Sequence, residues 1–183
     1  MIRPPFEVIE PRTREVPVVV EVPHAGLDLP PNVLATLVAP ARSIARDADL
    51  LVDELYVDAP DLGATLLVAH TSRYVADLNR SDDDIDAAVV AGDARPARPH
   101  ARGLLWRTTT EDELALERPL TRDEYRWRIA NVHRPYHETL RQILDRKLAR
   151  FGYVILLCGH SMPSVGRAGH ADGGVVRADV VPG

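Results

Sequence analysis

Two histidines that directly follow apolar runs are the first candidates for chemistry. His24 follows the β-branched run at 18–22, and His160 follows the apolar run at 153–158. A hydrolytic zinc site takes three protein ligands of the histidine and carboxylate type and leaves a position for water. The acidic cluster at 47–54 would supply the third ligand. The alternative is that both histidines hydrogen-bond a loop and that the acidic residues cap a helix.

The segment at 72–80 (SRYVADLNR) offers a second kind of chemistry, because it carries two arginines and an asparagine. The planar guanidinium of Arg73 or Arg80 suits a carboxylate, which it holds through two parallel hydrogen bonds. The alternative is that both are surface arginines, paired with Asp77 and with the acidic run at 82–84. The residues alone favour this second interpretation.

Three further side chains have a possible role. Tyr136 and His137 are adjacent in a helical pattern and either face a cleft or form the edge of the core. Cys158 is the single cysteine, so it makes no intramolecular disulfide. Its apolar neighbours favour a buried core residue over a thiolate ligand or nucleophile.

The elements that must position these residues alternate between strands and helices. The run at 18–22 predicts a strand that ends just before His24, and the run at 153–158 predicts a strand covered on both faces. Open α/β sheets bind ligands at the carboxyl ends of their strands. We therefore expect His24 and His160 to converge at one edge of the sheet.

The remaining elements complete an α/β layered fold. We predict strands at 64–69 and 73–78, short helices at 30–37 and 47–56, and a long loop at 81–103. The second short helix would begin with Asp47 or Asp49 as its N-cap and would place Asp49 and Asp53 on one face.

A long helical pattern runs over residues 121–151. It opens with a capping box at Thr121 and Glu124 and stops at Gly152. Pro135 lies inside the pattern, so we expect a kink or two successive helices.

Composition limits the class of protein. The chain has 183 residues and a net charge of −5, which fits one domain over 1–183 and argues against nucleic acid as a partner. The N-terminus lacks the apolar stretch of a signal peptide, and no apolar run approaches the ~20 residues of a membrane span. These features predict a cytoplasmic protein with no membrane partner.

Five pieces of the chain together resemble the N-formylglutamate amidohydrolase (N-formylglutamate deformylase) family. They occur in family order and span nearly the whole chain. The pieces are residues 22–26 (VPHAG), 47–56 (DADLLVDELY), 72–80 (SRYVADLNR), 136–137 (YH) and 159–162 (GHSM).

The resemblance implies a three-layer α/β fold of the zinc-dependent exopeptidase-like (phosphorylase/hydrolase-like) kind, with a mixed central sheet flanked by helices. It implies zinc as cofactor, with His24 and His160 as ligands. We choose Asp49 as the third ligand, with Asp47, Asp53 and Glu54 as alternates.

The resemblance also implies roles for residues outside the metal site. It makes Asn79 and Arg80 a pair that holds a substrate carboxylate, with Tyr136 and His137 beside the substrate. It makes Arg73 a catalytic group that polarises a carbonyl or stabilises charge. Family members continue past the point where this chain stops, into a part that carries the expected general base. Glu54 is then the substitute candidate for that base.

The implied activity is zinc-dependent hydrolysis of the amide of an N-formyl or N-acyl acidic amino acid such as N-formylglutamate. The products would be formate and glutamate, and the family name suggests histidine catabolism. The alternative is a non-catalytic, shortened family member that acts as a metal- or ligand-binding module. Loss of sheet strands would expose an edge, which predicts a homo-oligomer.

Overall fold

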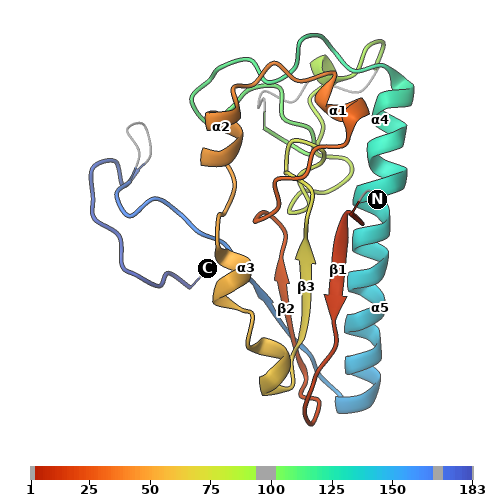
Figure 1. Ribbon diagram of the computed structural model, residues 1–183, viewed down its shortest axis with the longest axis vertical. Helices are drawn as coiled ribbons and strands as arrows, with labels where there is room; N and C mark the ends of the chain where they lie inside the picture. The colour runs from red at the N-terminus through yellow and green to blue at the C-terminus, as the bar shows by residue number, and fades with distance from the viewer. Residues whose placement is uncertain (1–2, 94–101, 167–170, 183) are drawn as a thin grey trace.

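The structure is a computed structural model that describes residues 3–93, 102–166 and 171–182. Its centre is a mixed sheet of four strands in the order β1-β3-β2-β4 (Figure 1). The antiparallel strand β1 (Phe6–Ile9) pairs with β3 (Thr65–Ala69). The strand β2 (Val18–Val22) runs parallel to both β3 and β4 (Ile155–Cys158). Parallel pairing brings the carboxyl ends of β2, β3 and β4 to one edge.

Helical elements cover both faces of this sheet, with α5 on one face and α3 on the other (Figure 1). The mixed sheet between helices confirms the predicted α/β class. In chain order the helical elements are α1 (Pro31–Leu34), α2 (Ala41–Arg46), α3 (Val52–Leu55), the 3-10 turns η1 (Ala59–Leu62) and η2 (Ala87–Val89), α4 (Arg122–Arg128), the π-helical turn η3 (Ile129–His133) and α5 (Arg134–Phe151).

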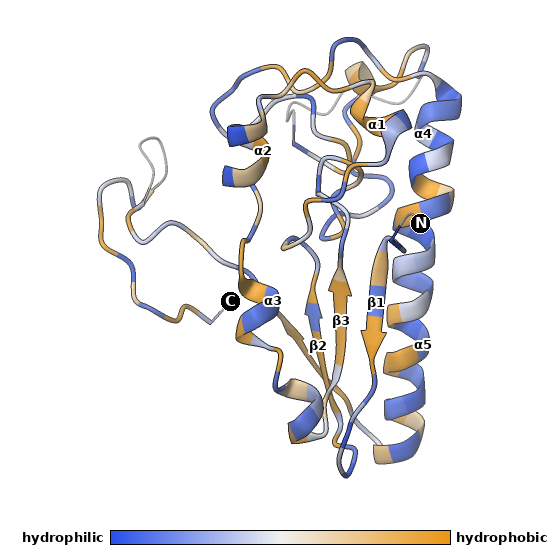
Figure 2. Ribbon diagram, in the orientation of Figure 1, coloured by the Kyte–Doolittle hydropathy of each residue, from blue (hydrophilic) through white to orange (hydrophobic). Residues whose placement is uncertain are grey.

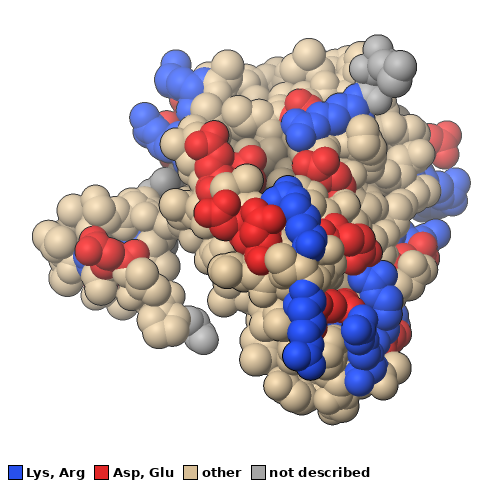
Figure 3. Space-filling model, turned by 60° about the horizontal axis from the view of Figure 1, so that its bottom comes forward, with Lys and Arg blue, Asp and Glu red and all other residues tan. Residues whose placement is uncertain are grey.

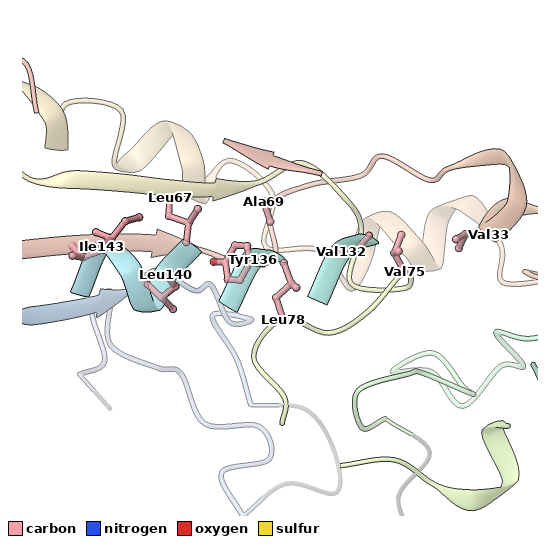
Figure 4. Packing of buried hydrophobic residues seen from close by; sticks show 10 residues of the cluster. Val33, Leu67, Ala69, Val75, Leu78, Val132, Tyr136, Leu140 and Ile143 are labelled. Carbon is pink, nitrogen blue, oxygen red and sulfur yellow. The ribbon is translucent and has the colours of Figure 1, made fainter. Parts of the chain in front are cut away.

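The largest part of the core lies between the sheet and α5. Leu67 from β3 packs here with Tyr136, Leu140 and Ile143 of the helix (Figure 4). The strands are apolar along most of their length, whereas α5 is apolar along one stripe only (Figure 2). A helix of this pattern is held by burial of that stripe.

A smaller cluster fills the opposite face of the sheet. Val20, Val22, Leu66 and Val68 alternate with the residues that face α5, and they pack against Val52 of α3. This alternation follows from the period of two in a strand, and it fixes the register of β2 against β3.

Several predicted elements are confirmed. The strand over 18–22 has the predicted bounds, and β3 covers 65–69. Thr121 and Glu124 form both hydrogen bonds of the capping box, and Gly152 ends α5 with a positive φ of 80°. The division expected at Pro135 takes the form of α4 and α5 joined by η3.

The strand predicted over 73–78 is wrong. These residues form turns, although Tyr74, Val75, Ala76 and Leu78 are buried. Apolar composition predicted burial correctly. No neighbouring strand pairs with this segment in the described structure. Its main-chain groups form hydrogen bonds with side chains and loops, and the Asp77 N–H, for example, donates to the Leu104 carbonyl at 2.8 Å.

The helix predicted over 47–56 is also wrong in its extent. Asp47 is the C-cap of α2, which lies just before the predicted helix, and α3 covers only the last part of the range. Leu51 lies between them with a φ of 65°, in the left-handed region that a helix cannot include. The predicted N-cap role of Asp47 and Asp49 is therefore replaced by other contacts.

The prediction that the strand at 153–158 is covered on both faces is wrong as well. All four residues of β4 are exposed, from Ile155 at 53% to Leu156 at 38%. The physical reason is position, because β4 is an edge strand with one neighbour. Beyond it the chain turns away from the sheet (Figure 1).

The strand β1 forms within the Pro-rich lead and was not predicted from the sequence. In the predicted loop at 81–103, η2 covers 87–89, and residues 94–101 lie outside the described ranges. The short helix predicted over 30–37 is present as the single turn α1.

Among the described helices, none has the length and apolar character that a membrane crossing requires. Acidic and basic side chains are interspersed over the face seen in Figure 3.

Candidate active site

The carboxyl ends of β2 and β4 bring the two candidate histidines together. The strands are parallel, and Glu21 of β2 stands opposite Cys158 of β4. His24 follows the first strand and His160 the second, and their ring centroids lie 5.1 Å apart. The predicted convergence is therefore present in the structure.

Asp49 completes a cluster with these two histidines. Its Oδ2 lies 3.0 Å from Nδ1 of His160 and 3.6 Å from Nδ1 of His24. The Asp49 N–H donates to the His24 carbonyl at 2.9 Å, which fixes the carboxylate beside the strand end. One ligand atom from each of the three residues lies within 4.8 Å of the others.

The other acidic candidates of the 47–56 segment are elsewhere. The Asp47 carboxylate accepts a hydrogen bond from the Tyr74 hydroxyl at 2.6 Å and another from the Thr110 N–H at 3.1 Å. Asp53 and Glu54 belong to α3, where Glu54 is exposed. Within the described ranges, no hydrogen bond or ion pair links either residue to the cluster.

Asp77, which was not singled out as a site residue in the sequence, is the polar centre behind the cluster. It is fully buried, and its Oδ1 accepts from Nε2 of His24 at 2.7 Å. The main-chain N–H of Asn79 donates to the same oxygen at 3.0 Å. Oδ2 accepts from Nη2 of Arg73 at 2.7 Å and from Nε1 of Trp106 at 3.0 Å. Every direction around this carboxylate is therefore filled by a donor.

The charges in this network reinforce one another. Burial alone would raise the pKa of Asp77, but His24 and Arg73 hold that pKa well below its usual range. Burial is likewise outweighed at Asp49, whose pKa His160 and His24 hold well below the usual range. Burial would lower the pKa of His24, yet its bonds to Asp49 and Asp77 raise it above the ordinary value.

Arg73 lies between the network and the surrounding cavity. Its Nε and Nη2 bond Asp77, its Nη1 donates to the Asp47 carbonyl at 3.1 Å, and its guanidinium stacks 4.3 Å from the ring centroid of Trp106. The alternative interpretation of the sequence predicted this pairing of Arg73 with Asp77. Arg73 also lines the cavity beside Asp49.

Asn79 and Arg80 are exposed beside the cluster. The Asn79 side-chain nitrogen lies 3.5 Å from Nε2 of His160. Arg80 forms a loose ion pair with Asp84 at 3.8 Å, which again matches the alternative interpretation. Neither residue lines the cavity beside Asp49.

Tyr136 and His137 differ in their surroundings. Tyr136 is fully buried against the sheet, and its hydroxyl donates to Oε2 of Glu21 at 3.2 Å. It is a core residue in this structure, which matches the core alternative. The His137 ring is bonded to the Leu78 main chain, and its Nε2 is buried without a hydrogen-bond partner among the described residues.

A cavity of about 780 Å³ opens beside Asp49 of the cluster, and neither His24 nor His160 is among its lining residues. Asp49, Arg73 and Ser161 form the wall nearest the histidines, and Ser161 Oγ donates to Asp49 Oδ1 at 3.3 Å. Arg46 and Arg177 also line it. Asp47, Asp49 and Asp172 line the same cavity, so its three guanidinium groups are accompanied by three carboxylates.

The donor set fits a divalent metal such as zinc. Two imidazoles and one carboxylate converge from separate elements, which is the composition of a catalytic zinc site with an open position. Asp77 binds the far ring nitrogen of His24, which fixes the ring and leaves Nδ1 facing Asp49. A carboxylate behind a histidine ligand is the usual outer support of such sites.

Trp106 and Thr110, which support Asp77 and Asp47, could not be found from the sequence, because they lie in a segment without periodicity. Asp77 could have been found from the sequence, because it lies within the 72–80 motif.

Comparison with known proteins identifies the family of this chain. Residues 16–183 match the family model described as N-formylglutamate amidohydrolase. The chain belongs to the N-formylglutamate amidohydrolase family.

Two curated family members support this assignment. The chain is 38% identical over 162 residues to the N-formylglutamate deformylase of Pseudomonas aeruginosa, covering 86% of this chain and 56% of that protein. It is 39% identical over 151 residues to the N-formylglutamate deformylase of Pseudomonas putida, covering 81% and 53%. The chain therefore spans about half the length of these relatives.

Solved structures give the same result for the fold. The crystal structure of N-formylglutamate amidohydrolase from Ralstonia eutropha matches with a TM-score of 0.81 and 33% identity, over 87% of this chain and 59% of that one. A gene product of Agrobacterium tumefaciens matches with a TM-score of 0.57 at 18% identity, which concerns the fold alone.

Proposed function

We propose that this chain carries the metal site of a zinc-dependent hydrolase that cleaves the amide of an N-formyl acidic amino acid such as N-formylglutamate. The observation that carries the proposal is the convergence of His24, Asp49 and His160, where Asp49 also lines a cavity whose wall includes Arg46 and Arg73. The names of the family and of the two Pseudomonas relatives support the substrate class.

His24, Asp49 and His160 would hold the ion. Zinc in such a donor set supplies Lewis-acid chemistry, because it polarises a carbonyl and makes water more acidic. The fold would then be of the zinc-dependent exopeptidase-like kind. The products of the reaction would be formate and the free amino acid, which for N-formylglutamate is glutamate. A place in histidine catabolism, a cytoplasmic location and self-association stay predictions.

The chain's own residues supply orientation and charge. Asp77 accepts from Nε2 of His24, so the ring keeps one orientation and presents Nδ1 to the site. Arg73 places a guanidinium in the cavity wall, and its contact with Asp77 keeps that charge in place. We propose that it stabilises negative charge on the substrate carbonyl.

The substrate carboxylate has two candidate partners. The family resemblance favours Asn79 and Arg80, whereas the cavity offers Arg46, whose only described ion pair is with Glu111. Glu54 was the candidate base, but it is exposed and does not line the cavity. The geometry therefore lends no support to Glu54 in that role.

The test is zinc content and formate release with the unaltered chain, Arg80→Ala and Arg46→Ala. Loss of a charged bidentate contact costs about 2–3 kcal/mol, so the variant that lacks the carboxylate partner should show a KM raised about 30–150-fold with unchanged zinc. Arg12→Ala is the matched control, because Arg12 pairs with Asp61 away from the cavity.

The outcomes distinguish an error in the residues assigned to the substrate carboxylate from an error in the proposed function. A raised KM in Arg46→Ala alone would remove Arg80 from the site but leave the reaction in place. Zinc binding and substrate binding without any formate release would instead support the alternative function, a non-catalytic metal- or ligand-binding module. A folded chain that binds no zinc would contradict the proposal.

A further inference from the structure

One helical rod, formed by α4, η3 and α5, contacts the loop that supports the metal cluster. We define the Asp77 loop as residues 74–80, which contains Asp77 behind His24 and Asn79 beside His160. The loop is not a strand, so no ladder of main-chain hydrogen bonds fixes its geometry. Its carbonyl groups are bound by side chains of the α4–η3–α5 rod.

Arg128, at the end of α4, binds the first part of the loop. Its Nη1 donates to the Tyr74 carbonyl at 2.8 Å and to the Val75 carbonyl at 3.1 Å. Its Nη2 donates to Thr36 Oγ1 at 2.7 Å. Arg128 is buried, and within the described ranges no carboxylate forms an ion pair with it. Burial lowers the pKa of Arg128 to about 10, so the side chain keeps its charge at neutral pH.

Two histidines bind the last part of the loop. His133 Nε2 donates to the Arg80 carbonyl at 2.9 Å, and the His137 ring is bonded to the Leu78 main chain. The two rings lie in contact, with centroids 4.3 Å apart and planes tilted by 51°. Asn79 therefore lies between two residues whose main chain is bound to the same rod.

The π-helical turn explains how one rod makes all three contacts. The Arg134 N–H bonds the Ile129 carbonyl, five residues back, so η3 contains one residue more than an α-helical turn. In an uninterrupted α-helix, positions 128 and 133 would point in directions about 140° apart. The extra residue brings Arg128 and His133 to the same loop. π-turns of this kind are frequent at functional sites.

We propose that Arg128, His133 and His137 are positioning residues, which hold the Asp77 loop in the one geometry in which Asp77 and Asn79 orient the two histidines of the metal cluster. The inference deepens the proposed function, and it rests on that function only for its effect on zinc and hydrolysis. The occupied carboxylate of Asp77 and the three hydrogen bonds of the buried Arg128 both indicate a loop held by specific bonds rather than by packing alone.

The test compares His133→Leu with His133→Gln, and Arg128→Met with Arg128→Lys. Leucine and methionine keep apolar volume but remove the donor, whereas glutamine and lysine keep a donor. We expect main-chain amide exchange in residues 77–80 to rise at least about tenfold in the donor-less variants, with exchange in β2 and β3 unchanged. Zinc affinity should fall about 10–100-fold, as for other losses of outer support, and the donor-keeping variants should restore part of it.

The result can overturn the inference in two ways. Exchange that rises equally in the loop and the sheet would show general destabilisation and no positioning role. A loosened loop with unchanged zinc affinity would show that the loop does not orient the cluster. If the unaltered chain bound no zinc, the proposed function would fail by itself. The inference would then be decided by the ring-nitrogen NMR shifts of His24, which should differ between His133→Leu and His133→Gln.

Discussion

The two histidines of the cluster follow parallel strands of one sheet, yet their surroundings are opposite. The His24 side chain is 2% exposed, and both ring nitrogens face carboxylates, at 2.7 Å for Asp77 and 3.6 Å for Asp49. The His160 side chain is 32% exposed, follows an exposed strand, and has one close bond, to Asp49 at 3.0 Å. A strand end therefore delivers a residue to the site, but the groups behind the residue decide how firmly it is held.

The largest effect is expected at Asp77, the centre of the buried half. Asp77→Asn keeps the shape but removes the charge that His24, Arg73 and Trp106 share. We expect the free energy of unfolding to fall by about 3–5 kcal/mol, because a buried charged group loses its partner. Urea unfolding at neutral pH measures the loss.

Asp49→Asn is the matched control for that experiment, since it removes a carboxylate from the other side of His24. Asp49 makes no contact with an arginine among the described ion pairs, so we expect a smaller loss of stability, about 1–2 kcal/mol, but complete loss of zinc. Equal losses of stability in the two variants would remove the distinction between the two halves.

The sequence predicted the geometry that depends on regular structure. The β-branched run before His24 and the apolar run before His160 mark strands, and parallel strands end at one edge of a sheet. The capping box at Thr121 and the stop at Gly152 followed from local hydrogen bonding in the same way. Each of these inferences needed only residues that are close in the chain.

The sequence did not predict what depends on distant partners. The Asp77 loop has the composition of a strand, but Arg128 and His133, more than 50 positions away, bind its carbonyl groups. The apolar residues of β4 indicated burial, yet whether a strand lies at an edge is set by the order of strands in the sheet. For the same reason, local sequence could not decide whether Asp47 or Asp49 joins the cluster. Asp47 is instead bound by Tyr74 and Thr110, which are distant in the chain.

Truncation of each histidine tests the comparison directly. His24→Ala and His160→Ala should both lose zinc. We expect His24→Ala to lose about 2–3 kcal/mol of unfolding free energy as well, because it leaves a cavity and removes one of the two donors to Asp77 Oδ1. His160→Ala should lose less than about 0.5 kcal/mol, as is usual for exposed positions.

Zinc content and chemical unfolding of the metal-free proteins separate these two effects. His24→Gln serves as the control for folding, since its amide can still donate toward Asp77 while it removes the imidazole. A His160→Ala chain that unfolds as easily as His24→Ala would show that both halves are equally fixed by the protein.

The smallest effect is expected at Glu124, a half-buried charge at the start of α4 that serves as a reference for the buried network. Arg118 and the Thr121 N–H hold the pKa of Glu124 at about 2, below its ordinary value of 4.5. A lowered carboxyl pKa adds stability above pH 4.5, and that stability is lost as the pH falls toward 2. Because solvent screens the pair, we expect the charge to add only about 0.5 kcal/mol to the free energy of unfolding at pH 6 and less at pH 3. The reference is Glu124→Gln, which keeps the capping acceptor.

Urea unfolding of both proteins at the two pH values gives this difference, and the contributions of the buried carboxylates cancel because both proteins contain them. A difference that grew toward pH 3 would reverse the sign argued here, and a change in zinc affinity would connect the start of α4 to the cluster.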